Sequence, residues 1–420
     1  MARILIGLSN AIKKNEEYCI TGWNEQLCNA LVRNGNDVLV YIPNYFHKYI
    51  FCGQNNLKKE INETALVQDI KNFNPDLVIA FNNSIYHNIS NIVDCPIILW
   101  GADTDTLWNQ QDLIKKNVGR YLFFCFSEQE MKPRMVRYGI PKDKIFNVRV
   151  ATDLHNTNIK QDKNISFIGT NFAIPDKFSN FIQEFSGTNG LQTVVRTIFN
   201  DPFISKERIL DMIKNEPDDF RNAFSKISQD DYILFFSGEK RISVLHAVSD
   251  LGLNLYGVDW KRIHDILPSL FACFNKQVIT TAQENEYIYN SSKICINISH
   301  EQTKFAIPYR VCDIMASGGC LVSSRTPYFT NVFKLDTIPQ FDSPEAAHDI
   351  CKKLLDNDSM RQDIVAQCND IIAKSWRFEN RFKEIEQILN INLLNNSKGT
   401  LKILKPKKNS FLRFLSNKKL

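Results

Sequence analysis

The sequence is poor in glycine, with 16 residues in 420, and it lacks the glycine-rich motifs of two large nucleotide-binding classes. The first expected strand-to-helix turn, "IGLSNAIKK", has one glycine, Gly7, where the dinucleotide-binding pattern G-x-G-x-x-G needs three. The P-loop pattern G-x-x-x-x-G-K-[ST] does not occur. NAD-dependent and P-loop chemistry therefore lose their main sequence support.

Long hydrophobic runs are also missing. No stretch reaches about 18 uninterrupted apolar residues, the length that a membrane-spanning helix needs. The opening "MARILIGLSN" lacks the longer apolar segment and the small-residue cleavage site of a secretory signal. We expect a cytoplasmic protein, with peripheral contact to the inner face of the cell membrane through its tail.

The eleven cysteines include no C-x-x-C pair, and several lie inside apolar runs. This distribution favours reduced, buried thiols over disulfides or a metal site. The histidines, among them His47 and His87, form no metal-ligand pattern. The expectation is a metal-independent protein that needs no cofactor.

Positive charge is concentrated at one end of the chain. Residues 398–420 carry eight Lys or Arg and no acid, so the net charge of +5 leaves about −3 for the rest. Proteins that bind nucleic acid concentrate positive charge on the folded surface, so no nucleic-acid partner is expected.

Apolar segments of strand length alternate with helical segments in the first part of the chain. The expected strands are "RILIGL", "DVLVYI", "PDLVIAF", "PIILWG", "YLFFCFS" and "IFNVRV". A helix over "GWNEQLCNALVRNG" ends at Gly35, a good C-terminal signal. Short, continuous apolar strands separated by helices predict a parallel sheet that is covered on both faces.

The same rhythm restarts near residue 155, after a polar, turn-rich stretch. "ISFIGTN" begins a new strand, a mainly helical segment follows over residues 175–233, and further strands are expected at "LNLYGVDW", "QVITT", "KICINIS" and "GCLVSS". A length of 420 residues also favours two domains. The fold class is therefore α/β, with two successive Rossmann-like halves.

The stretch "AIPYRVCDIMASGGCLVSS" predicts a helix that begins near Pro308 and stops at Gly318 or Gly319. Arg310 and Asp313 then lie three residues apart near the start of the helix, where open α/β sheets bind ligands. The arginine can hold phosphate oxygens and the aspartate can accept hydrogen bonds from ribose hydroxyls. The alternative is a surface ion pair.

"KICINIS", "IPYRVCDIMASGGCLVSS", "FDSPEAAHDICKKLL" and "WRFENRFKEI", in this order, resemble the C-terminal half of CgeB-like group 1 glycosyltransferases. "ISFIGT" and "LNLYGVDW" resemble earlier strands of that half. The resemblance implies the GT-B fold, two Rossmann-like domains facing across a cleft. It also implies a nucleotide-sugar donor on the second domain and an acceptor on the first.

The resemblance assigns Arg310 to the donor diphosphate. Asp313 stands where related family 4 glycosyltransferases have the second glutamate of E-x7-E, the ribose contact, while the first falls at Phe305. Glu301 is a candidate substitute from the preceding loop.

Further donor-binding candidates follow three of the expected strands; the alternatives are an ordinary turn with a solvent lysine, a core tryptophan and a merely hydrogen-bonded histidine. These candidates are Gly169, Thr170, Asn171, Lys177, Gly257, Trp260, Ser299 and His300.

In the first domain, "WGADTD" places Asp103 and Asp105 just beyond an apolar strand. Either is a candidate catalytic base for an acceptor hydroxyl in an inverting enzyme; the alternative is an Asx turn or helix cap. Thr21 and Gly22 are acceptor-side candidates, with a capping threonine and a turn glycine as the alternative.

The expected domains are 1–155 for the acceptor and 156–375 for the nucleotide sugar, followed by a crossover helix over 376–394 and a basic amphipathic tail over 395–420. Leucine, isoleucine and phenylalanine alternate with basic residues in the tail, a composition that suits an anionic membrane surface. A disordered basic tail is the alternative.

The sequence therefore predicts a glycosyltransferase that moves a sugar from a nucleotide-sugar donor to a cell-surface glycan or lipid-linked acceptor. A non-catalytic nucleotide-binding scaffold of a glycan assembly system is the alternative from another class, and a sugar-nucleotide epimerase is a third possibility.

Overall fold

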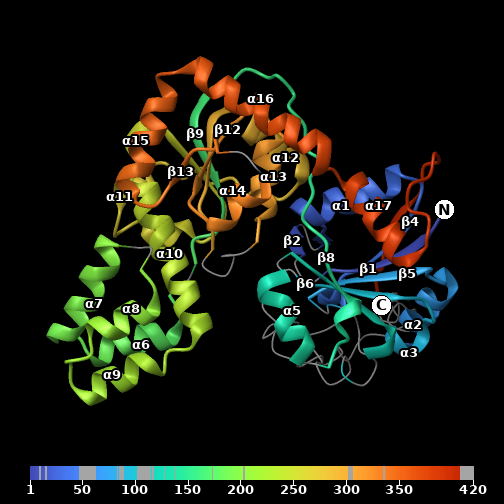
Figure 1. The fold of residues 1–420 in the computed structure, drawn as a ribbon, viewed down its shortest axis with the longest axis horizontal. Coiled ribbons are helices and arrows are strands. Elements are labelled where there is room, and N and C mark those ends of the chain that lie inside the picture. The colour runs from blue at the N-terminus through green and yellow to red at the C-terminus, as the bar shows by residue number, and fades with distance from the viewer. Residues whose placement is uncertain are drawn as a thin grey trace, which may run out of the picture. The chain divides into compact units, whose positions relative to one another are not determined.

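The computed structural model divides the chain into two compact units. Unit 1 comprises Met1–Asp153 and Ser375–Leu420, and unit 2 comprises Leu154–Lys374 (Figure 1). The residues that the structure describes are 1–8, 11–14, 17–46, 63–82, 84, 89–101, 115, 118–126, 128–137, 139–172, 174–201, 204–300, 306–333 and 336–406.

Unit 1 is built on a parallel sheet with the strand order β14-β4-β1-β5-β6-β7-β8. Its strands are β1 (Arg3–Gly7), β4 (Asp37–Tyr41), β5 (Leu77–Phe81), β6 (Ile97–Gly101), β7 (Tyr121–Cys125), β8 (Ile145–Asn147) and β14 (Leu401–Ile403). A small antiparallel hairpin consists of β2 (Ile12–Lys14) and β3 (Glu17–Cys19). β5 and β6 are buried at every residue, as parallel strands covered on both faces require.

Helices cover both faces of this sheet (Figure 1). Side chains alternate between the faces along each strand: Ile4 and Ile6 pack with α1 (Gly22–Arg33) and α17 (Phe378–Leu389), while Leu5 packs on the other side. That other side is covered by α2 (Glu63–Phe73), α3 (Ile89–Ile92) and α5 (Glu128–Arg137).

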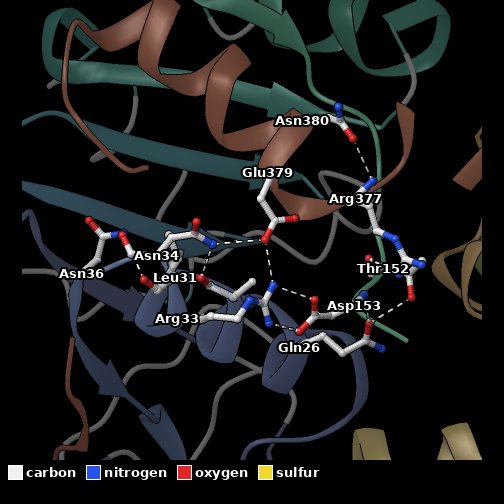
Figure 2. A network of polar contacts seen from close by, with 11 residues as sticks. Gln26, Leu31, Arg33, Asn34, Asn36, Thr152, Asp153, Arg377, Glu379 and Asn380 are labelled. Atoms are coloured by element: carbon white, nitrogen blue, oxygen red, sulfur yellow. Dashed lines mark hydrogen bonds and ion pairs between the residues drawn. The ribbon is translucent and has the colours of Figure 1, made fainter. Parts of the chain in front are cut away.

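The segment after residue 375 returns to unit 1, where Phe378, Phe382 and Ile385 of α17 enter the core against Trp23 of α1. A polar network fixes α17 to α1 (Figure 2). Arg33 donates from Nη1 to Oδ2 of Asp153 at 2.6 Å and from Nη2 to Oε1 of Glu379 at 2.8 Å.

The first part of the expected tail is a strand, which the sequence did not predict. β14 pairs with β4 in parallel register, and the backbone N–H of Val38 donates to the carbonyl of Thr400 at 2.7 Å. The buried Asn36 side chain supports this return by donating to the carbonyls of Leu31 and Leu393 at 3.0 and 2.7 Å. A separate tail starting at residue 395 is therefore a wrong boundary; residues 407–420 lie outside the described part.

Unit 2 contains a second parallel sheet with the strand order β10-β9-β11-β12-β13. Its strands are β9 (Lys163–Ile168), β10 (Leu253–Tyr256), β11 (Ser292–Asn297), β12 (Cys320–Ser324) and β13 (Gln340–Phe341). The helices packed around them are α11 (Pro268–Phe271), α12 (Ala282–Asn290), α13 (Tyr309–Met315), α14 (Pro327–Phe333), α15 (Pro344–Leu355) and α16 (Asp358–Ser375). "QVITT" is not a strand: residues 275–280 have no regular structure and lead into α12.

Five helices separate β9 from β10 in the chain and form a helical layer with a phenylalanine-rich core (Figure 1). Phe178 and Phe235 stack at 4.0 Å between ring centroids within it. The helices are α6 (Asp176–Glu184), α7 (Asn189–Asn200), α8 (Lys206–Met212), α9 (Asp218–Ser225) and α10 (Gln229–Ala247). The last of them, α10, runs back to the sheet and brings two basic residues to it.

Candidate functional site

The loop after β9 is held closely against the loop after β10. Gly169 donates its N–H to the carbonyl of Tyr256 at 3.0 Å, and Asn171 donates to the carbonyl of Val258 at 3.1 Å. Trp260 closes the contact, since its indole N–H donates to the carbonyl of Gly169 at 2.8 Å. We call residues 169–172 the β9 loop.

Gly257 is essential for this approach. Its φ is 128°, and a β-carbon there would lie 2.0 Å from the carbonyl oxygen of Gly169. Trp260 is fully buried and meets Phe167 edge to face, so it positions the β9 loop and offers no free ring to a base or ribose. The alternative of a core tryptophan therefore describes Trp260 better than donor contact does.

Two guanidinium groups lie around the ring of Phe167. The Cζ of Arg310 is 5.1 Å from the ring centroid and that of Arg241, from α10, is 5.7 Å away. Arg241 also lies 4.3 Å from the Phe172 ring and donates to the carbonyl of Thr170 at 2.6 Å. Neither arginine has a carboxylate within 4 Å among the described residues, so both can neutralise an anionic ligand.

The local environment strengthens the field of these two arginines. Arg241 is only 5% exposed, and burial, together with the positive charge of Arg310, lowers its pKa. Lys240, the preceding residue of α10, is also buried. Positive charge held in a poorly solvated place attracts an anion more strongly than the same charge in water does.

His300 is a neutral neighbour of this cationic group. Its ring meets Phe172 edge to face at 4.9 Å, and its pKa falls to about 3 because of burial and because of the charges of Arg241 and Lys240. At neutral pH it is therefore a hydrogen-bonding imidazole and not a cation.

The ends of β11 and β12 form a buried polar cluster next to His300. Asn297 donates to the hydroxyls of Ser299 and Ser323 at 3.3 and 2.9 Å, and the N–H of Ser299 donates to Ser324 at 2.9 Å. Ser299 is thus part of the strand-end framework.

Two buried amide oxygens, Oδ1 of Asn171 and Oδ1 of Asn297, have no hydrogen-bond partner among the described residues. A ligand hydroxyl would satisfy either one.

Asp313 is 2% exposed, in contrast to the partly exposed Arg310. Burial raises the pKa of Tyr289 well above its usual value; Arg310 lowers it and Asp313 raises it, so the phenol lies within the field of both residues. The predicted helix is confirmed as α13, but it ends at Met315, before Gly318 and Gly319, and neither glycine has a positive φ. Ribose binding by Asp313 stays a prediction.

The structure does not bring Lys177 to this group. It lies on α6, its side chain is 63% exposed, and its Nζ is 3.5 Å from Oδ2 of Asp231 in α10. The alternative of a solvent lysine describes it.

Thr21 and Gly22 belong to unit 1, at the start of α1. The carbonyl of Thr21 accepts the N–H of Asn24 at 3.2 Å, its side chain makes no capping hydrogen bond, and Gly22 has a φ of 51°. Their acceptor role stays a prediction. The candidate residues Asp103, Asp105 and Glu301 lie outside the described residues. So do His47, His87 and Phe305.

Lys240 and Arg241 belong to the site but were not predicted from the sequence. Their signal is a basic pair that follows Glu239 between two apolar stretches of the helix, "YILFFSGEKRISVLHA". Lysine and arginine usually avoid such buried positions. Over the described ranges, no three or more His, Cys, Asp or Glu side chains gather as a metal site. Within those same ranges no helix is both long enough and apolar enough to cross a membrane.

Comparison with known proteins matches one segment of the chain to a protein family. Residues 241–387 match a family model described as "Glycosyl transferase-like", and this segment includes Arg241, His300 and Arg310. A search of curated proteins found no match.

Solved structures with a similar fold span nearly the whole chain. A glycosyltransferase from Rickettsia africae ESF-5 has a TM-score of 0.52 and 11% identity, covering 94% of this chain and 99% of its own. A sucrose-phosphate synthase from Thermosynechococcus elongatus has a TM-score of 0.51 and 9% identity, covering 93% and 98%. An alpha-glucosyltransferase in complex with UDP and a 13-mer DNA has a TM-score of 0.51 and 11% identity, covering 93% and 100%. The predicted fold class is confirmed: the chain has the GT-B fold of two Rossmann-like α/β units, and its residues 241–387 form a glycosyltransferase-like segment.

Proposed function

We propose that the protein is a glycosyltransferase of the CgeB-like group that transfers a hexose from a nucleotide-sugar donor to a cell-surface glycan or lipid-linked acceptor. The observation that carries the proposal is the pair of guanidinium groups, Arg241 and Arg310, around Phe167 at the C-terminal edge of the unit 2 sheet. Both arginines lie in the segment that matches the glycosyltransferase-like model.

The donor diphosphate is bound by this pair. Ligands of open α/β sheets bind at the C-terminal ends of the strands, and the β9 loop, Ser299 and the start of α13 all lie at those ends. Arg310 is the more exposed of the two and contacts the phosphates directly, while the buried Arg241 holds the loop carbonyl of Thr170 and adds its charge.

The sugar is held by neutral groups. The unsatisfied amide oxygens of Asn171 and Asn297 accept hydrogen bonds from its hydroxyls. His300, kept neutral, donates or accepts according to its tautomer and adds no negative charge near the phosphates.

The chemical step breaks the bond between the anomeric carbon and the diphosphate, and the acceptor hydroxyl forms a new bond to that carbon. Negative charge develops on the departing nucleoside diphosphate, where Arg241 and Arg310 stabilise it. In this mechanism the guanidinium groups supply the positive charge, so the proposal includes no metal and no cofactor. Asp103 or Asp105 takes the proton of the acceptor hydroxyl if the reaction inverts configuration.

The acceptor is proposed to lie at a membrane or envelope surface because of the basic and apolar residues 407–420. Binding to an anionic leaflet gains roughly 1 kcal/mol for each basic residue near the surface. The proposed location is the inner face of the cell membrane, reached by peripheral contact.

The test is incubation with a panel of nucleotide sugars, followed by mass spectrometry of the products. UDP-hexoses are the first donors, because a protein of the same fold is described in complex with UDP. Sugar transfer or donor hydrolysis supports the enzyme. Binding without turnover supports the non-catalytic scaffold, the reading suggested by Phe305 in place of the first glutamate of E-x7-E. Release of a changed sugar without an acceptor supports the epimerase.

A further inference from the structure

Unit 1 has a hollow of about 520 Å³ between the end of β8 and helix α17. The volume is within the range of small-molecule sites, about 300–1,000 Å³. Its lining includes Asn147, Arg149, Ser375, Arg381, Lys383 and Glu384. We call this the unit 1 hollow.

The hollow has an excess of positive charge. Arg381 forms an ion pair with Glu384 at 3.0 Å and donates to the carbonyl of Ser375 at 2.9 Å, so the single carboxylate of the lining is already engaged. Arg149 and Lys383 have no carboxylate within 4 Å in the part of the chain that the structure describes. Glu384 also lies in the field of Arg149, and the three cations and one carboxylate of the lining leave an excess of two positive charges for a ligand.

Arg149 is exposed, and its guanidinium group rests on an aromatic ring that limits its motion. Its Cζ lies 5.6 Å from the centroid of the buried Trp376 ring. The backbone of Trp376 is itself fixed, because its carbonyl accepts the N–H of Thr152 at 3.0 Å. A cation fixed in this way loses less conformational entropy on binding.

Asn147, the last residue of β8, indicates a second feature of the ligand, a hydrogen-bond donor beside an anionic group. Its buried Oδ1 has no hydrogen-bond partner among the described residues, and only a donor can satisfy it. A ligand hydroxyl beside the anionic group fits this requirement.

We propose that the unit 1 hollow binds a phosphate monoester of the acceptor, with a neighbouring hydroxyl on Asn147. An excess of two positive charges matches a phosphate monoester, which carries about −1.5 to −2 at neutral pH, better than a single carboxylate. A phosphorylated glycan and a lipid phosphate share this chemistry. The acceptor assignment rests on the proposed function; the anion site itself does not.

The experiment titrates glucose 6-phosphate into the full-length chain carrying R310Q, which weakens phosphate binding at the unit 2 site. The R149Q/K383Q pair is compared in this background with R137Q/K142Q, two exposed basic residues of unit 1 outside the hollow. Glucose serves as the uncharged ligand. Vesicles of phosphatidylcholine with and without phosphatidic acid test the lipid source.

We expect saturable binding of glucose 6-phosphate, at least tenfold weaker in R149Q/K383Q and unchanged in R137Q/K142Q, with no comparable binding of glucose. Binding only to phosphatidic acid vesicles, with the same dependence on Arg149 and Lys383, also supports the site and assigns the lipid source. Equal affinities in the two pairs, or no saturable binding of either probe, overturn it. Failure of nucleotide-sugar turnover in the unmodified chain would count against the proposed function alone.

Discussion

Replacement of Gly257 by alanine tests the geometry of the donor site most sharply. The added β-carbon would lie 2.0 Å from the carbonyl oxygen of Gly169 and 2.7 Å from its carbon, at a φ of 128°. A backbone conformation that suits only glycine costs about 1–3 kcal/mol, and an overpacked contact costs a further 1–3 kcal/mol. We therefore expect a loss of about 2–6 kcal/mol in the free energy of unfolding and much weaker nucleoside diphosphate binding.

Gly187→Ala is the matched control. Gly187 has a φ of 83° but no atom within 4 Å of an added β-carbon, so it isolates the backbone strain, about 1–2 kcal/mol. Urea unfolding and calorimetric titration with UDP are measured on both variants. Equal stability of the two variants, with unchanged UDP binding in Gly257→Ala, would refute the reasoning about the β9 loop.

Three further predictions concern pH, the polar network and the tail. The pKa of His300 in the folded state is lowered to about 3, so the unfolded state takes up a proton first as pH falls below about 6.5. The free energy of unfolding therefore decreases between about pH 6.5 and 3. His300→Gln should reduce that decrease when unfolding is measured as a function of pH. The Arg33–Glu379 pair is half-exposed, so a double-mutant cycle with Arg33→Ala and Glu379→Ala should give a coupling of about 0.2–1 kcal/mol, and a value above 2 would contradict its surface character. Deletion of residues 407–420 should abolish binding to phosphatidylserine vesicles, which carry no phosphate monoester, with unfolding unchanged. Deletion from residue 398 also removes β14 and should destabilise unit 1. Binding to phosphatidylserine vesicles that survives the shorter deletion would exclude the tail as the contact.

The strands of both sheets could be predicted because parallel strands buried on both faces have continuous apolar sequences. "PDLVIAF" and "PIILWG" correspond to β5 and β6, whose residues are all buried. "QVITT" is also rich in β-branched residues but forms no strand. A short run rich in β-branched residues becomes a strand only where a partner strand is free. Here β10 and β11, which precede and follow "QVITT" in the chain, both pair with β9.

β14 could not be predicted from its local sequence, because its strand character depends on a distant partner. "LKI" lies among lysines and is followed by Pro406. Its place beside β4 is set by contacts with residues more than 350 positions earlier, such as Thr400 with Asp37 at 2.6 Å. Tertiary pairing decides the structure of such a segment.

The candidate site was predicted in part. Arg310, His300 and the β9 loop follow from their positions at strand ends and helix starts, which local sequence reveals. Arg241 lies 71 residues after Thr170 of the β9 loop, in the last helix of an inserted helical layer, so only the fold brings it to Phe167. Trp260 was predicted to contact the donor but is completely buried. Its burial depends on packing with distant residues, which the neighbouring sequence does not show.

The most direct test of the central claim is the rate of nucleoside diphosphate release from a UDP-hexose in the unmodified chain, Arg310→Gln and Arg196→Gln. Arg196 is an exposed arginine of α7, so its replacement removes the same charge away from the site. The account predicts release by the unmodified chain and Arg196→Gln, and a loss of tenfold or more in Arg310→Gln. The same rate in all three proteins would contradict the assignment of Arg310 to the donor diphosphate.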